Sequence, residues 1–155
     1  MALATSATAD IIVTFNEGAP KDRFTFQNVS DCALTSATLS VDLNGSAGAL
    51  VFDTTDKGAG VEVFQPFELV AGKAFVTDHS TVSDGEKVLT INVKNLKAGG
   101  KIAFTIDVDD TLGQREITVN DAEISGATAS TQVSGATEVA TFNGSRAVIP
   151  LDCAS

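Results

Sequence analysis

Two segments of the chain alternate strictly between apolar and polar residues, and this pattern is the strongest constraint on the fold. The alternation runs through 36–43 and 101–108. Because successive side chains of a β-strand point to opposite faces, it predicts strands with one face in a hydrophobic core. The apolar side chains expected to face that core are Ala37, Leu39, Val41, Leu43, Ile102, Phe104, Ile106 and Val108. No segment shows the sustained apolar stripe of an amphipathic helix, so we expect no helices.

Shorter alternating segments account for much of the remaining chain, and turn-forming residues separate them at intervals of about ten residues. Asn44-Gly45 and Asn143-Gly144 are typical of two-residue hairpin turns. The stretch 125–137 is rich in small polar residues but keeps the alternation, so we expect a pair of polar strands there rather than a linker. The other short segments expected to be strands are 11–15, 24–26, 50–52, 61–63, 67–69, 89–93, 117–119, 139–141 and 147–149.

About ten short strands with regular turns predict an all-β fold, a single antiparallel β-sandwich of the immunoglobulin-like or jelly-roll type. The length of 155 residues suits one domain, and no segment repeats at a fixed period. We therefore expect one β-sandwich domain over 10–155, preceded by a short N-terminal extension at 1–9.

The composition excludes several classes of function. The chain has 20 acidic and 10 basic side chains, and the resulting net charge of −10 disfavours nucleic acid and anionic membranes as partners. It has one His, which rules out a metal site built from several imidazoles, and no Trp or Tyr on which sugars or bases could stack. No apolar run after residue 10 is long enough to span a membrane. We therefore expect neither nucleic-acid binding nor membrane insertion.

The N-terminus and the two cysteines both suggest export. Ala7-Thr8-Ala9 is typical of a signal-peptidase site, with Asp10 as the first residue of a secreted, extracellular or periplasmic protein; the alternative for 1–9 is a tag of small residues. Cys32 and Cys153 lie near opposite ends of the chain and are expected to form one structural disulfide. The alternative for the cysteines is two free, buried thiols.

The candidate ligand-binding residues are acidic. Asp107 and Asp109 lie two residues apart at the end of an expected strand, on its outward face, and Asp110 begins the following turn. A second acidic turn contains Asp53 and Asp56. Clustered carboxylate oxygens are the ligands that Ca²⁺ prefers, so the sequence predicts a calcium site, although the spacing is not that of an EF-hand. The alternative is a strand end whose carboxylates are simply solvated.

Two further features have weaker functional interpretations. His79 is next to Asp78 and Ser80, but no nucleophile motif accompanies it, so we expect an exposed loop or edge histidine rather than part of a Ser-His-Asp triad. Phe64, Pro66 and Phe67 form the most aromatic segment, which suggests an exposed contact patch. The alternative for this patch is that at least one Phe belongs to the core.

Three Asn-x-Ser sequons are present, at Asn28, Asn44 and Asn143. They would accept glycans in a eukaryotic secretory pathway. Two of them are also Asn-Gly turns, and the N-terminus is compatible with a bacterial signal peptide, so we do not expect the sequons to be glycosylated.

The segments 10–24, 58–69 and 103–119 resemble a family of small secreted proteins of marine alphaproteobacteria that are labelled aggregation factor core-like. The similarity covers Asp10 to Leu151, and Asp-Val-Asp-Asp-Thr-Leu-Gly at 107–113 is its most specific part. The resemblance implies a secreted protein with calcium-linked adhesion and a signal cleavage before Asp10. It implies no catalytic residues.

We therefore expect a secreted or cell-surface protein without enzymatic activity that acts in adhesion, aggregation or extracellular matrix, with Ca²⁺ as the one candidate cofactor. Its partners would be further copies of itself, other surface proteins or polysaccharide. An alternative is a fibre subunit in which residues 1–9 add a strand to the sheet edge of a neighbouring copy. A secreted hydrolase is the third hypothesis; it requires a pocket lined by convergent carboxyl groups with raised pKa values.

Overall fold

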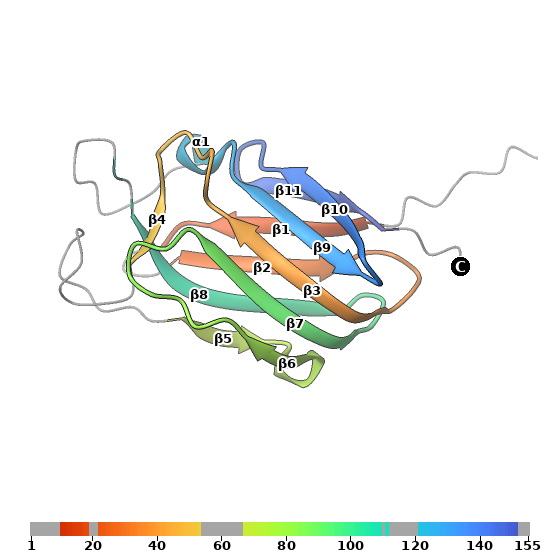
Figure 1. The fold of residues 1–155 in the computed structure, drawn as a ribbon. Helices are drawn as coiled ribbons and strands as arrows, with labels where there is room; N and C mark the ends of the chain where they lie inside the picture. Colours follow the sequence, from red (N-terminus) through yellow and green to blue (C-terminus); the bar gives the residue numbers. More distant parts are fainter. Residues whose placement is uncertain (1–9, 19–21, 54–66, 110, 112–120, 152–155) are drawn as a thin grey trace, which may run out of the picture.

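The computed structural model describes residues 10–18, 22–53, 67–109, 111 and 121–151. These residues form two antiparallel β-sheets, which confirms the predicted β-sandwich (Figure 1). The strands are β1 (Asp10–Asn16), β2 (Asp22–Asn28), β3 (Leu34–Asp42), β4 (Val51–Asp53), β5 (Glu68–Ala71), β6 (Val76–His79), β7 (Val88–Leu96), β8 (Lys101–Asp109), β9 (Thr128–Val133), β10 (Ala136–Thr141) and β11 (Arg146–Pro150).

The first sheet has the order β11-β1-β2-β8-β4, with β5 also paired to β8, and the second has the order β10-β9-β3-β7-β6. Figure 1 shows the second sheet lying across the first, with β3, β7 and β9 over β1, β2 and β8. Strand β8 pairs with three other strands of the first sheet. It pairs with β2 on one edge and, in succession, with β5 and β4 on the other.

The core between the sheets is built from the apolar positions of the alternating segments. All eight of the core-facing side chains expected from 36–43 and 101–108 are buried. Four phenylalanines form its aromatic centre, where the Phe24 ring lies 5.0 Å from Phe15, 5.3 Å from Phe104 and 6.4 Å from Phe142, centroid to centroid. The described phenylalanines therefore serve mainly to fill the sandwich.

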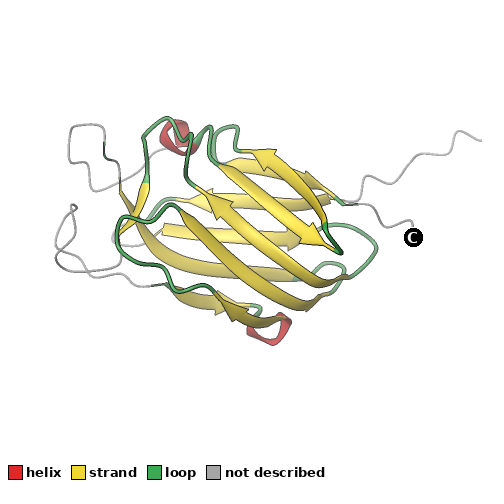
Figure 2. Ribbon diagram, in the orientation of Figure 1, coloured by secondary structure: helices red, strands yellow, loops and turns green. Residues whose placement is uncertain are grey.

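The secondary structure differs from expectation in small ways. Two short helices, η1 (Lys73–Phe75) and α1 (Asp121–Ile124), interrupt the strands, so the expectation of no helix is wrong (Figure 2). Each is a single turn, too short to produce an amphipathic stripe in the sequence. Strand β6 was not expected, because its burial pattern does not alternate. The expected strands at 61–63 and 117–119 lie outside the described residues.

The polar side chain of Asn28 is fully buried at the end of β2. Its Nδ2 donates to the carbonyl oxygens of Cys32 (2.8 Å) and Leu96 (3.0 Å), and its Oδ1 accepts from the Ser30 backbone N–H (3.0 Å). Asn28 therefore joins the β2–β3 connection to the end of β7. Because its amide nitrogen is buried and engaged, this sequon cannot accept a glycan in the folded protein.

We predict that Asn28→Ala lowers the free energy of unfolding by about 2–4 kcal/mol, because buried carbonyl and N–H groups lose their partners. Asn143→Ala is the control: it removes an exposed asparagine of another sequon and should change stability by less than about 0.5 kcal/mol. Urea unfolding measures both values. Equal effects of the two substitutions would contradict the structural role of Asn28.

Cys32 lies in the β2–β3 connection and accepts one of the Asn28 hydrogen bonds. No cysteine among the described residues is a free thiol. The backbone of Cys32 is tied to Ser30 and Asn28, and Cys32 and Leu151 both line a cavity described below. Cys153 lies outside the described residues, so its pairing with Cys32 stays a prediction.

Candidate metal centre

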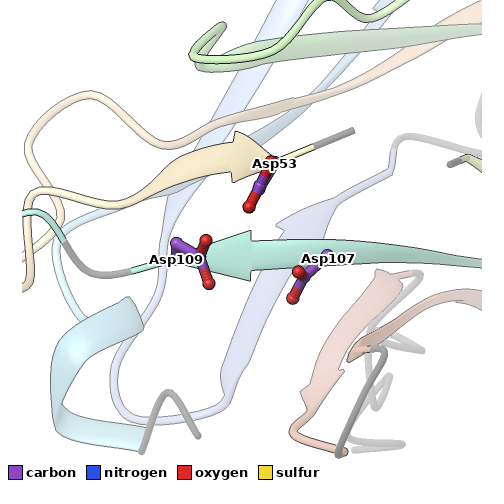
Figure 3. Close-up of side chains that lie close together, drawn as sticks. All are labelled: Asp53, Asp107 and Asp109. Carbon is purple, nitrogen blue, oxygen red and sulfur yellow. The ribbon is translucent and has the colours of Figure 1, made fainter. Parts of the chain in front are cut away.

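Three carboxylates meet where β4 and β8 pair. Asp53 is directly opposite Asp107 in the register, and Val51 is opposite Asp109. Because side chains two residues apart on a strand point to the same face, Asp107 and Asp109 share the face on which Asp53 lies. One carboxylate oxygen from each of the three lies within 4.8 Å of the others (Figure 3). We refer to Asp53, Asp107 and Asp109 as the acidic trio.

The acidic trio is buried to an unusual degree for carboxylates. Asp53 is 2% exposed and Asp107 is 8% exposed, while Asp109 is half-buried. Both oxygens of Asp53 and the Oδ2 of Asp109 are buried, and no N–H or hydroxyl group of the described residues donates a hydrogen bond to them. Removing an ionised carboxylate from water without a partner is costly, so this arrangement calls for a proton or a cation.

The interpretation of these residues as a solvated strand end is therefore wrong for Asp107. Strand β8 is buried at every position from Ile102 to Val108, on the core face and on the opposite face. Alternation in the sequence correctly placed Ile102, Phe104, Ile106 and Val108 in the core, but it carried no signal that the other face is also covered.

A fourth carboxylate, Asp22, lies close to the acidic trio at the start of β2 and is 3% exposed. Its Oδ1 accepts from the Gly18 N–H (3.1 Å) and its Oδ2 accepts from the Val108 N–H (3.0 Å). The second bond fixes the backbone of β8 between Asp107 and Asp109. The sequence gives no sign that Asp22 belongs here, because its closeness to these residues depends on the pairing of β2 with β8.

Burial and mutual repulsion disfavour the charged forms of these acids. Burial is the largest cause that raises the pKa of Asp53 to about 8, followed by contacts with the Asp84 and Asp109 carboxyl groups. Burial also raises the pKa of Asp107 to about 7, with the negative charges of Asp109 and Asp22 adding to it. The pKa of Asp22 is likewise raised to about 7, chiefly by burial, against its two backbone hydrogen bonds. A divalent cation would compete with these protons.

The other predicted site residues have different positions. Asp56 and Asp110 lie outside the described residues, as do Phe64 and Pro66. Phe67 is half-buried and packs against the core, with its ring centroid 5.1 Å from that of Phe104. For Phe67 the structure thus supports the alternative, a core contact.

His79 lies at the end of β6, an edge strand, and is exposed as expected. Its Nδ1 donates to the Ser80 carbonyl oxygen (3.0 Å), and its ring lies 4.3 Å from that of Phe67. Neither neighbour is the hydroxyl or the carboxylate that a catalytic triad requires.

A separate cavity of about 240 Å³ lies at the opposite end of the sandwich. It is formed near the start of β3, the β9–β10 hairpin and the end of β11, and Glu138 is its one acidic lining residue. This cavity therefore lacks the convergent carboxyl groups that the hydrolase hypothesis requires; such groups lie at the acidic trio. No helix within the described residues is long and apolar enough to cross a membrane.

Comparison with known proteins leaves the family open. No family model matches the chain, and no curated protein matches it. Among solved structures, the chain is similar to the GH20 exo-β-N-acetylglucosaminidase of Vibrio harveyi in complex with N-acetylglucosamine (18% identity, TM-score 0.34). It is also similar to a GH18 chitinase of Chromobacterium violaceum (15% identity, TM-score 0.39). The alignments cover 88% of this chain but 17% and 19% of those two proteins, so the chain spans less than a fifth of either.

A third similar structure is smaller. It is described as biomass-sensing modules from RsgI-like proteins of Clostridium thermocellum that resemble the family 3 carbohydrate-binding module of the cellulosome. The identity is 14% and the TM-score 0.36, and the alignment covers 84% of this chain and 96% of that one. All three likenesses are too distant to assign a function.

Proposed function

We propose that this chain is a non-enzymatic β-sandwich module that acts outside the cell in adhesion, aggregation or matrix formation, and that it binds Ca²⁺ at the acidic trio. The observation that carries the proposal is the Asp53 carboxylate, which is 2% exposed, receives no hydrogen bond from an N–H or hydroxyl group within the described part of the chain and is directed towards Asp107 and Asp109. Secretion, the Cys32–Cys153 disulfide and the aggregation-factor resemblance belong to the same proposal.

The geometry of the acidic trio suits calcium. Ca²⁺ binds oxygen ligands at about 2.3–2.6 Å, so two ligand atoms on opposite sides of one ion are separated by roughly twice that distance. The trio's ligand oxygens lie within 4.8 Å of one another, which allows all three to reach a single ion. One Ca²⁺ would neutralise two of their three charges, and backbone oxygens or water would complete its shell.

Carboxyl groups with raised pKa values are also a property of hydrolases, but the burial of the trio argues against that role. Asp53 and Asp107 are together almost inaccessible, which leaves no room for a substrate against them. Inverting glycosidases need their two carboxyl groups about 6.5–9.5 Å apart, and retaining enzymes about 5–5.5 Å apart, on either side of a sugar. A small ion fits the compact trio better.

Calcium also provides a physical route to self-association. Molecules with a net charge of −10 repel one another, and a bound or bridging divalent cation reduces that repulsion. We also propose polysaccharides and other surface proteins as partners.

The test is the addition of millimolar Ca²⁺ to metal-stripped protein, followed by light scattering and calorimetric titration. We expect heat of binding and self-association in the wild type, and neither in Asp53→Asn. Asp31→Asn is the matched control, because Asp31 is exposed in the β2–β3 connection, remote from the acidic trio. Protein that takes up no Ca²⁺ would contradict the proposal.

The alternative of a fibre assembled by strand donation has one supporting observation. Strand β10 lies at the edge of its sheet, and among the described strands it pairs with β9 alone; it is largely exposed, with Val139 57% exposed. An unprotected edge of this kind can accept an added strand. Polymers that form without Ca²⁺ and disappear on deletion of residues 1–9 would favour this alternative.

A further inference from the structure

The connection between β6 and β7 runs beside the acidic trio, although both of these strands belong to the second sheet. The Gly85 N–H donates to the Phe52 carbonyl oxygen (2.8 Å), and the Phe52 N–H donates to the Glu86 carbonyl oxygen (2.9 Å). Phe52 immediately precedes Asp53 in β4. These two bonds therefore place the Asp84-Gly85 turn next to the Asp53 side chain.

The Asp84 side chain meets that of Asp53. The two carboxyl groups are close enough to hydrogen-bond, and Asp109 makes the same kind of contact with Asp53 from β8. Two ionised carboxylates repel each other at this separation, so each contact needs a proton or a cation between the oxygens. The Asp84 oxygens are not among those that lie mutually within 4.8 Å, so coordination of a shared ion would require this exposed side chain to turn towards it.

We infer that Asp84 supplies a carboxylate ligand, in addition to those of the acidic trio, to a Ca²⁺ ion bound there. This inference rests on the proposed function, and it names a ligand that the sequence did not reveal. It also gives the ion a structural consequence. Asp53 and the other trio members belong to the first sheet, whereas Asp84 belongs to a connection of the second, so one ion would tie the two sheets together at this end of the sandwich.

The position of Asp84 suits this task better than that of its neighbours. Glu86 is also exposed, but its backbone carbonyl oxygen already holds the turn through the bond from Phe52, and the carboxyl group of this turn that meets Asp53 is that of Asp84. Glu86→Gln therefore removes one negative charge from the same turn without removing the proposed ligand. It is the matched control for the general electrostatic effect of Asp84→Asn.

The experiment is calorimetric titration of metal-stripped protein with CaCl₂, using the wild type, Asp84→Asn, Glu86→Gln and Asp53→Asn. We expect Asp84→Asn to weaken Ca²⁺ binding by about tenfold or more and Glu86→Gln by less than about threefold, because ligand charge sets affinity in such sites. Asp53→Asn should abolish binding. Because Asp84 is exposed, Asp84→Asn is expected to fold normally, which circular dichroism verifies.

A second measurement separates a ligand from a nearby charge. With Eu³⁺ as the probe, the luminescence lifetime reports the number of water molecules bound to the ion. Loss of a carboxylate ligand in Asp84→Asn should let water replace it and shorten the lifetime, and Glu86→Gln should leave the lifetime unchanged. Ca²⁺ should also slow hydrogen exchange at the amides of Phe52 and Gly85 in the wild type more than in Asp84→Asn.

The outcomes distinguish the two proposals. If the wild type binds Ca²⁺ and Asp84→Asn binds it with the same affinity and the same Eu³⁺ lifetime, the role of Asp84 is wrong and the calcium site stands. If Asp84→Asn and Glu86→Gln weaken binding equally, Asp84 acts only through its charge and the inference is again wrong. Wild-type protein without any Ca²⁺ binding would overturn both.

Discussion

Metal-free protein is expected to melt roughly 10 °C lower at pH 8 than at pH 5, and saturating Ca²⁺ to restore most of that difference. The cause is the burial of Asp53, Asp107 and Asp22, which raises their pKa values from 3.8 to about 8, 7 and 7. A buried charge without a partner costs about 3–5 kcal/mol. Each kcal/mol shifts the melting temperature of a domain of this size by roughly 2–4 °C.

The direction of this pH dependence follows from proton linkage. Between about pH 4 and pH 7 the folded protein holds protons on these carboxyl groups that the unfolded chain has released. Stability is therefore greatest below the unfolded pKa of 3.8 and falls as the pH rises through the folded values of about 7 and 8. Ca²⁺ binds the deprotonated groups, so its stabilising effect should be large at pH 8 and small at pH 5.

Thermal unfolding at several pH values, with EDTA or with CaCl₂, measures this dependence. Asp53→Asn should make the metal-free pH dependence smaller and remove the response to Ca²⁺, since an uncharged amide replaces the most strongly shifted of the three carboxyl groups. Asp31→Asn also removes one negative charge, and it should keep both the pH dependence and the response to Ca²⁺. A metal-free melting temperature that rises from pH 5 to pH 8 would contradict the burial of these acids.

Gly126→Ala is expected to lower the free energy of unfolding by more than about 3 kcal/mol, since steric overlap adds to backbone strain. Gly126 has a φ of +95°, and a Cβ atom there would lie 2.2 Å from the Gly45 carbonyl oxygen. That oxygen belongs to the backbone of the turn after β3 and cannot rotate away. The substitution should therefore separate α1 from this turn.

Gly135→Ala is the matched control for this effect. Gly135 also has a positive φ, +81°, but a Cβ atom there would meet nothing within 4 Å. Gly135→Ala should lower the free energy of unfolding by about 1 kcal/mol, the cost of a positive φ at a residue that has a Cβ atom. Chemical denaturation of the two variants gives the comparison. Similar losses at the two positions would show that the close approach of Gly126 to Gly45 is not a stabilising feature of the fold.

Much of the fold was predictable from local pattern, because a strand with one buried face leaves its period in the sequence. The segment 36–43 and β3 coincide within two residues at either end, and 101–108 and β8 within one. The polar hairpin of β9 and β10 was also expected from its retained alternation. Strand β6 and the two single-turn helices were missed, since segments this short have no period to detect.

The candidate site was predictable only in part. Asp107 and Asp109 were recognised because they lie two residues apart on one strand, and Asp53 because its turn is acidic. Asp22 and Asp84 were missed for a different reason. They are 31 residues before Asp53 and 31 residues after it, and no spacing rule connects them with the acidic trio.

The sequence by itself determined that this chain forms an antiparallel sandwich with a phenylalanine-rich core, because alternation and turn residues act over a few neighbouring positions. Only the tertiary structure decided that acids from β2, β4, the β6–β7 connection and β8 meet at one end of that sandwich. Strand pairing between distant segments sets which carboxylates become neighbours and how far they are removed from water. The same pairing turns a solvated acidic turn into a buried set of charges that requires a proton or a cation.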